Sequence, residues 1–200
     1  MNEDYNRVYQ FKIKLKHIKP EIWRVIQVPE IYTFWDLHVA IQDAMGWQDC
    51  RLHEFILTNP TSGEKKKIGI PTEESINDKT LPGWKEFISM YFNKKNKNAV
   101  YIYDFGDNWQ HIITLEGIIP VDENIFYPRC IAGERACPME DCDSMPGYED
   151  ILEILENPED GEYESTIISL GDKYDPEYFN PETVFFDDPE ERFKETFEVE

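Results

Sequence analysis

Hydrophobic and polar residues alternate strictly in the first part of the chain. Over Tyr9–Leu15 every second residue is apolar, with glutamine and lysines between. Because successive strand side chains point to opposite faces, this pattern predicts a half-buried strand with one solvated face. Ile22–Val28 predicts a second, antiparallel strand. His53–Thr58 predicts a third, and the lysine-rich run Lys65–Ile70 predicts an edge strand.

A helical period replaces the alternation between Thr33 and Met45. Thr33 is a suitable N-cap residue, and Asp36 follows three residues later. Gly46 supplies the left-handed conformation that ends many helices. His38 lies at the edge of the apolar stripe, where we expect a half-buried, hydrogen-bonded residue rather than a ligand. The stripe consists of Phe34, Leu37, Ile41, Ala44 and Met45.

Alternation returns in the stretch Tyr101–Glu116, where Gly106-Asp107-Asn108 separates two apolar-patterned runs. This arrangement predicts a β-hairpin. On its second strand one face carries Trp109, His111, Ile113 and Leu115. Asp104 and Asp107 either cap backbone amides in the turn or contribute to a polar site at the end of the sheet.

The pattern changes after Pro120. Residues 127–147 contain three prolines and no clear period, and such a segment is uncommon in a compact domain unless it has a function. Amphipathic helices are predicted from Tyr148 to just before Pro158 and over Glu162–Leu170. From residue 172 the chain is acidic with scattered aromatic residues, so this arm either packs on the domain or extends from it.

Together these elements predict an α+β fold. We expect a single domain over residues 1–171, built on a mainly antiparallel sheet with one helix packed on a face. Further C-terminal helices follow the sheet. Residues 172–200 form an acidic, aromatic-containing C-terminal arm.

The formal net charge of −21 is unevenly distributed. Residues 1–100 carry a balance of +2, and residues 101–200 carry −23. A negative field of this size repels phosphate, which disfavours nucleic-acid binding through the C-terminal half. The alternative is the basic N-terminal strand, but alternating lysines are typical of a solvated face. These lysines are Lys12, Lys14, Lys16 and Lys19.

Neither a membrane span nor a signal peptide is predicted. No run of about 18 apolar residues occurs, and the first residues lack the basic-then-apolar order of a signal peptide. We therefore expect a cytoplasmic protein without a membrane partner. Disulfides are not expected there, and the spacing of Cys130, Cys137 and Cys142 matches no paired zinc knuckle.

Several short motifs occur in a characteristic order: Ile22-Trp23-Arg24, Leu37-His38, Gly46-Trp47, Leu52-His53 with Phe55, Tyr103–Asp107 with Trp109, His111, Leu115 and Glu116, Cys130-x2-Gly133-x2-Ala136, Glu140-Asp141 and Gly147-Tyr148. In these motifs the chain resembles the plasmid pRiA4b ORF-3-like proteins, some of which are described as insertion-element TnpR passenger proteins. The resemblance covers roughly residues 8–156 and implies an accessory role beside mobile-element genes, with no assigned activity. One loop departs from the family pattern, because Asp143-Ser144 stand where glycines are usual.

The main hypothesis is a non-catalytic binding module, because no complete catalytic constellation can be read from the chain. Trp23, Trp47 and Trp109 offer flat apolar anchors, and Arg24 offers a bidentate cation. The irregular Cys130–Gly147 loop, laid beside the Gly106 turn, would form one wall of a pocket. The ligand would be an unidentified protein or small molecule.

Two enzymatic alternatives remain. A divalent-metal-dependent hydrolase or nuclease needs two or three carboxylates or imidazoles that converge. Its ligands would come from Asp104, Asp107, His111, Glu140 and Asp141, with His38 and His53 as further candidates. A thiol nucleophile would be Cys130, with Arg129 lowering its pKa.

All of these hypotheses require the hairpin turn and the proline-containing segment to meet. The candidate polar site is Asp104, Asp107, Trp109, His111, Glu140 and Asp141, with Arg24, His38, His53 and Cys130 as second-tier residues.

Overall fold

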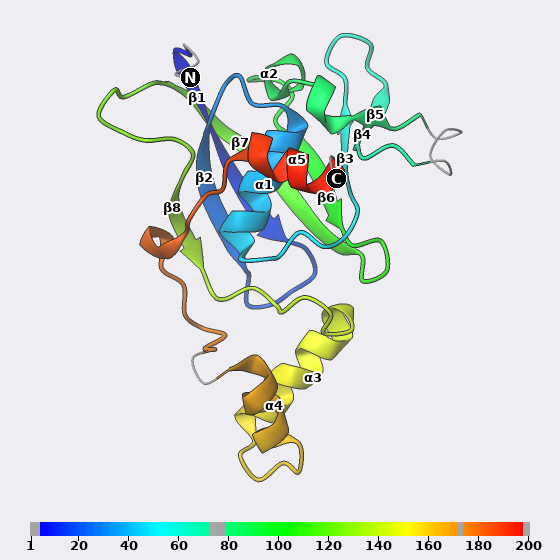
Figure 1. The fold of residues 1–200 in the computed structure, drawn as a ribbon, viewed down its shortest axis with the longest axis vertical. Coiled ribbons are helices and arrows are strands. Elements are labelled where there is room, and N and C mark those ends of the chain that lie inside the picture. The colour runs from blue at the N-terminus through cyan, green and yellow to red at the C-terminus, as the bar shows by residue number, and fades with distance from the viewer. Residues whose placement is uncertain (1–4, 73–78, 172–173, 198–200) are drawn as a thin grey trace.

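An eight-stranded, largely antiparallel sheet organises the chain (Figure 1). The computed structural model describes residues 5–72, 79–171 and 174–197. Its strand order is β5-β4-β3-β6-β7-β1-β2-β8, and among the strands in these residues only β4 and β5 pair in parallel. The predicted α+β class is confirmed. The strands are β1 (Arg7–Leu15), β2 (Trp23–Pro29), β3 (His53–Thr58), β4 (Lys65–Gly69), β5 (Leu81–Pro82), β6 (Asn98–Tyr103), β7 (Trp109–Pro120) and β8 (Arg129–Glu134).

The alternating segments form the strands that their pattern predicts. β1 pairs with β2 on one side and with β7 on the other, so it is central in the sheet. The apolar residues of β1 face the core, where Phe11 and Ile13 are fully buried. Because burial of apolar surface is the main favourable term in folding, this alternation fixes which face of the sheet is covered.

The helix α1 (Phe34–Met45) lies across that covered face (Figure 1). Its N-terminus has the predicted capping box: the Asp36 amide donates to Thr33 Oγ1 at 3.2 Å, and the Thr33 amide donates to Asp36 Oδ2 at 2.7 Å. Gly46 ends the helix with φ of 82°. The predicted helix boundaries are therefore confirmed, and the stripe residue Phe34 packs edge-on against Phe55 of β3.

The predicted hairpin is formed by β6 and β7, and it is longer than expected at both ends. Tyr103 pairs with Trp109, so the connection contains five residues. Two of these, Asp104 and Asn108, have positive φ of 55° and 57°. As predicted, alternate residues of β7 such as His111 face the core.

The segment 127–147 is more regular than the sequence predicts. Its first part forms β8, which pairs antiparallel with the edge of β2. The strand is held by backbone hydrogen bonds, and its side chains are all half-buried or exposed. A strand that lies over no deep core has no alternating signature, which explains why the sequence pattern missed it.

The helices after this segment form a narrow extension below the sheet (Figure 1). α3 (Ser144–Glu156) begins four residues before the predicted start at Tyr148, and α4 (Tyr163–Leu170) matches the prediction within one residue. Short helical turns, η2 (Gly83–Lys85) and α2 (Ile88–Tyr91), lie at the other end of the sheet. Among the described helices, none has the length and apolar character needed to cross a membrane.

The described part of the acidic arm packs on the domain. It runs through a short turn, η3 (Pro181–Thr183), and ends in α5 (Pro189–Phe197). Figure 1 shows α5 in front of α1, and an ion pair between Arg192 and Asp43 joins the two helices. Of the two alternatives for the arm, the packed one is observed. The domain boundary at residue 171 stays a prediction.

Candidate functional site

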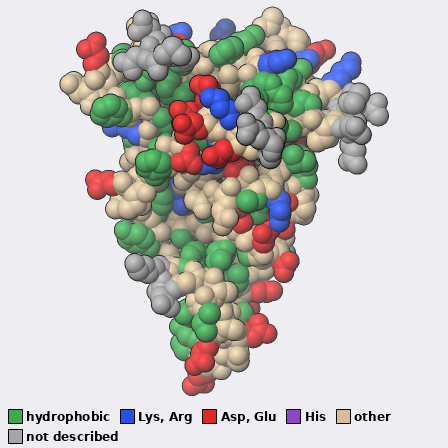
Figure 2. Space-filling view, in the orientation of Figure 1, with side chains coloured by type: hydrophobic (Ala, Val, Ile, Leu, Met, Phe, Trp, Pro, Cys, Tyr) green, Lys and Arg blue, Asp and Glu red, His purple; other side chains and the backbone are tan. Residues whose placement is uncertain are grey.

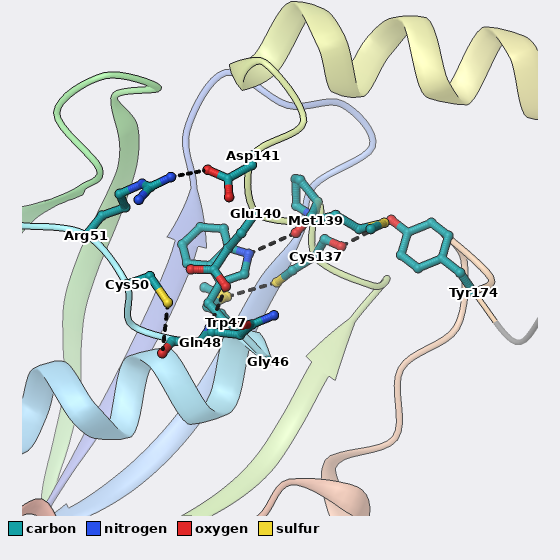
Figure 3. Close-up of a pocket in the computed structure, with 12 residues that line it drawn as sticks. Gly46, Trp47, Gln48, Cys50, Arg51, Cys137, Met139, Glu140, Asp141 and Tyr174 are labelled. Atoms are coloured by element: carbon teal, nitrogen blue, oxygen red, sulfur yellow. Dashed lines mark hydrogen bonds and ion pairs between the residues drawn. The ribbon is translucent and has the colours of Figure 1, made fainter. Parts of the chain in front are cut away.

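A pocket of about 300 Å³ lies where the chain leaves α1 and meets the loop between β8 and α3 (Figure 3). Its lining comes from residues 45–51 except Asp49, from residues 137–141, and from Tyr174 of the arm. Trp47 and Cys137 are buried, whereas Arg51 and Asp141 are exposed. The pocket therefore has an apolar interior and a charged edge.

Hydrogen bonds between segments hold the pocket walls in place. The Trp47 indole Nε1 donates to the Pro138 carbonyl at 2.8 Å, and the Tyr174 hydroxyl donates to the Cys137 carbonyl at 3.1 Å (Figure 3). The sulfur atoms of Cys137 and Met45 lie 3.1 Å apart. Three segments distant in sequence are thus fixed to one another around the pocket.

Glu140 links the pocket to the hairpin. Its Oε1 accepts a hydrogen bond from the Tyr103 hydroxyl at 2.5 Å, and its Oε2 accepts one from the Gln48 amide at 2.6 Å. Burial, together with the neighbouring carboxylate, raises the pKa of Tyr103 well above its usual range. The hydroxyl therefore stays protonated as a donor, and both oxygens of Glu140 have a partner.

Arg51 links the hairpin turn to Asp141. Its Nη2 donates to Asp141 Oδ1 at 2.6 Å, and its Nε lies 3.3 Å from Asp104 Oδ2. Asp104 also caps the turn, because its Oδ1 accepts from the amides of Gly106 and Asp107 at 2.8 and 3.2 Å. The two segments that the sequence hypothesis required to meet do so through Arg51 and Tyr103.

Two of the six residues of the predicted polar site, Glu140 and Asp141, line the pocket, and the other four do not: Asp104, Asp107, Trp109 and His111. His111 is fully buried, and burial lowers its pKa to about 3, so it is neutral at physiological pH. Trp109 is a core residue 5.9 Å from the Trp47 ring, centroid to centroid. Asp107 lies near Cys142, where it adds to the effect of burial in raising that thiol's pKa to about 11.

Two of the second-tier residues, Arg24 and Cys130, lie in surroundings that suit a role in stabilising the fold. Arg24 is buried, and its guanidinium donates to the Ala44 carbonyl at 2.9 Å, near the C-terminus of α1, and to the Glu134 carbonyl at 3.0 Å. It also lies over the Phe179 ring at 3.6 Å. Burial raises the pKa of Cys130, which is the opposite of what an activated nucleophile needs.

The remaining second-tier residues, His38 and His53, form a buried stack with centroids 3.4 Å apart. His38 Nε2 lies 2.7 Å from Asp49 Oδ1, and its Nδ1 lies 2.8 Å from the Tyr101 hydroxyl. Because Gln42 donates to that hydroxyl at 2.7 Å, the Tyr101 proton is directed at Nδ1, and His38 Nε2–H is directed at Asp49. Burial lowers the pKa of both histidines.

Sequence reasoning missed Arg51, Gln48 and Tyr174, which line the pocket, and Asp49, which binds His38. An exposed arginine or glutamine after a helix carries no local signal of function. The only available clue was position, because these residues follow the Gly46 stop that precedes the Trp47 anchor.

The lysines of the N-terminal strand have local partners. Lys14 and Lys19 each pair with Glu21, at 2.9 and 3.1 Å. Lys16 donates to Gln110 at 3.0 Å, and Lys12 lies over the Trp23 ring at 4.3 Å. These contacts match the solvated face that the alternation predicts.

Within residues 5–72, 79–171 and 174–197, no group of three or more histidine, cysteine or acidic side chains is arranged to hold a metal ion. In particular, His111 contributes to the core while Glu140 and Asp141 are bound to Tyr103 and Arg51. The divalent-metal hydrolase or nuclease stays a prediction.

Comparisons with known proteins point to one family. A family model described as "Plasmid pRiA4b ORF-3-like protein" matches residues 7–183, ending before α5 begins. The uncharacterised protein y4hQ of Sinorhizobium fredii is 30% identical over 151 residues, which cover 76% of this chain and 74% of the relative. A crystal structure of protein MM3350 of Methanosarcina mazei, described as being of unknown function, has a TM-score of 0.86 and 49% identity, covering 92% of this chain and 100% of that one.

Proposed function

The chain belongs to the plasmid pRiA4b ORF-3-like family, and we propose that it is a non-catalytic binding module whose ligand enters the Trp47 pocket. The observation that carries this proposal is that the pocket's charged groups are held in fixed positions by the protein itself. Glu140, Asp141 and Arg51 are each held by a partner from another segment. Such side chains are positioned in advance, which lowers the entropic cost of binding.

The chemistry of the lining favours binding over turnover. General acid–base catalysis works best with a group whose pKa lies near the working pH. The described lining contains no histidine, and burial raises the pKa of the Cys137 thiol to about 11. The Cys137 thiol is therefore not activated, and the carboxylates serve as fixed hydrogen-bond acceptors.

The same lining indicates the ligand class. Trp47, Met45 and Met139 offer an aromatic ring and two polarisable thioethers to an apolar body. Glu140 and Asp141 at the edge favour hydrogen-bond donors or a positive charge on the ligand. At about 300 Å³ the pocket is at the small end of ligand sites. We therefore expect a small amine or amide with an apolar portion.

The test is a thermal-shift and ligand-observed NMR screen of small amines and amides against the full chain. Met139→Trp fills the pocket, whereas Met90→Trp adds the same ring at a position that is 61% exposed and outside the lining. Hits should raise the Tm of the wild type and of M90W but not of M139W. Hits that bind M139W equally well, or turnover of a compound by the pure protein, would contradict the proposal.

An accessory role beside mobile-element genes is a separate part of this proposal. Its support is the family description, which refers to a plasmid reading frame. Deleting the gene from its host and measuring the frequency of plasmid or element transfer tests it. An unchanged frequency would remove this part while leaving the pocket hypothesis intact.

A further inference from the structure

The α5 helix rests on the outer side of α1 through an ion-pair cluster. Arg192 Nη2 lies 2.9 Å from Asp43 Oδ1, and Nη1 lies 3.7 Å from Asp49 Oδ2. Asp187, on the arm itself, also binds this guanidinium. The side chains of Asp43 and Asp49 are only 6% and 7% exposed, so Arg192 enters a nearly closed site. We call Asp43 and Asp49 the carboxylate pair.

Two tryptophans form the second half of the contact. Trp35 of α1 and Trp84 of η2 both pack against Phe193, with ring centroids 5.6 and 5.5 Å away. Both also pack against Phe197, at 5.4 and 5.1 Å. The Trp35 indole in addition donates to the Pro189 carbonyl at 2.9 Å. We call Trp35 and Trp84 the tryptophan pair.

The fit of α5 to these two pairs is incomplete. Three carboxylates face one guanidinium, and the Arg192 Nη1 atom is buried without a hydrogen-bond partner. Behind Trp35, both ring nitrogens of buried His53 also lack a partner. α5 itself buries no residue among those described, and its first turn is acidic. Figure 2 shows acidic side chains gathered on this face of the molecule.

We propose that the carboxylate pair and the tryptophan pair form a recognition site for an arginine-bearing amphipathic helix of a partner protein. α5 occupies this site within the chain until such a helix replaces it. The partner helix carries an arginine followed by aromatic residues on one face, as α5 does, and has fewer acidic residues than α5.

Charge and chain position both argue for this occupant. The carboxylate pair places two acidic groups around one guanidinium, which favours a segment that brings more positive charge. Burial raises the pKa of Asp49 to about 6, against the lowering effects of His53 and Arg192. α5 also lies beyond the residues that the family model matches. The site shares no lining residue with the Trp47 pocket, so it is independent of the proposed function.

The probe is a fluorescein-labelled peptide of residues 187–197, added to full-length protein and followed by anisotropy. In wild-type protein the tethered α5 competes with the peptide. The variant Arg192→Ala weakens the tethered helix, so we expect it to bind the peptide at least tenfold more tightly than the wild type does. Adding Asp43→Asn to this variant, or using a peptide with Arg192→Ala, should remove the gain.

Lys194→Ala is the matched control. This variant also removes one positive charge from α5, but Lys194 forms its ion pair with Glu190 of the same helix. It should behave as the wild type does. Equal peptide binding by wild type and R192A, or no binding by folded R192A, would overturn the proposal.

A second measurement does not depend on any variant. Hydrogen exchange of the wild-type protein reports how often α5 leaves the surface. We expect the α5 amides to exchange at least tenfold faster than those in the centre of α1. Equal protection of the two helices would show that α5 is a permanent part of the fold, and the proposal would fail.

Discussion

Replacing Tyr103 by phenylalanine tests whether the pocket is held in place by the hairpin. The change removes one hydroxyl, which donates to Glu140 at 2.5 Å and accepts from the Cys50 amide at 2.9 Å. The ring, stacked 5.2 Å from Trp47, keeps its packing. Any effect therefore reports on the two hydrogen bonds.

The expected loss of stability follows from the burial of the partners. A hydrogen bond to a charged group contributes about 1.5–3 kcal/mol. Glu140 is partly exposed, so water replaces part of the lost interaction. We therefore expect Y103F to lower the free energy of unfolding by about 1–2 kcal/mol. In a chain of this size that corresponds to a decrease in Tm of roughly 2–8 °C.

Urea denaturation of wild type, Y103F, Glu140→Gln and the double variant completes a double-mutant cycle, with an expected coupling of about 1 kcal/mol. Tyr91→Phe is the matched control, because its hydroxyl donates to Glu86 at 2.6 Å outside the pocket lining. Y91F should lose similar stability and bind pocket ligands normally, whereas Y103F should bind them more weakly. A coupling below about 0.3 kcal/mol would refute the reasoning.

Three further predictions concern the framework of the site. Thr33→Ala removes the side-chain cap of α1 and should cost about 1 kcal/mol, measured by thermal denaturation, while Thr61→Ala in an exposed turn should cost little. Arg24→Met removes the buried guanidinium that donates to the carbonyls of Ala44 and Glu134 and should cost about 3 kcal/mol in urea denaturation; an unchanged midpoint would contradict this. The raised pKa of Asp49, about 6, means that the folded state takes up a proton more readily than the unfolded state, so stability from this group is lost as the pH rises through 6. The measured quantity is the free energy of unfolding of the wild type minus that of Asp49→Asn. This difference should be about 1 kcal/mol larger at pH 5 than at pH 7.5, and a smaller value at pH 5 would contradict the prediction.

The elements predicted correctly are those whose signal lies in neighbouring residues. The period of the Thr33–Met45 segment and its caps predict α1 with the observed bounds. β8 was missed because a strand held at a sheet edge by backbone bonds needs no alternation of side chains. Figure 1 shows that the chain leaves this strand and passes below α1 on its way to α3.

The candidate site was only partly predictable. Glu140, Asp141 and Asp104 were chosen because acidic residues near a turn are chemically suggestive, and all three make contacts that join the segments around the pocket. His111 was chosen on the same grounds but lies in the core. The type of a residue does not tell a pocket residue from a core residue. The buried face of a strand is known only once the elements that pack on the sheet are known.

The sequence by itself determined the strands of the central sheet, the capped helix and the side of each that is buried, because periodicity and capping act over a few residues. The tertiary structure decided what these elements bring together. Tyr103 and Glu140 are 37 residues apart, and Arg192 lies 149 residues from Asp43, so both contacts depend on strand order and on the path of the arm. Contacts of that kind come from burial and charge pairing across the whole chain, and no local pattern encodes them.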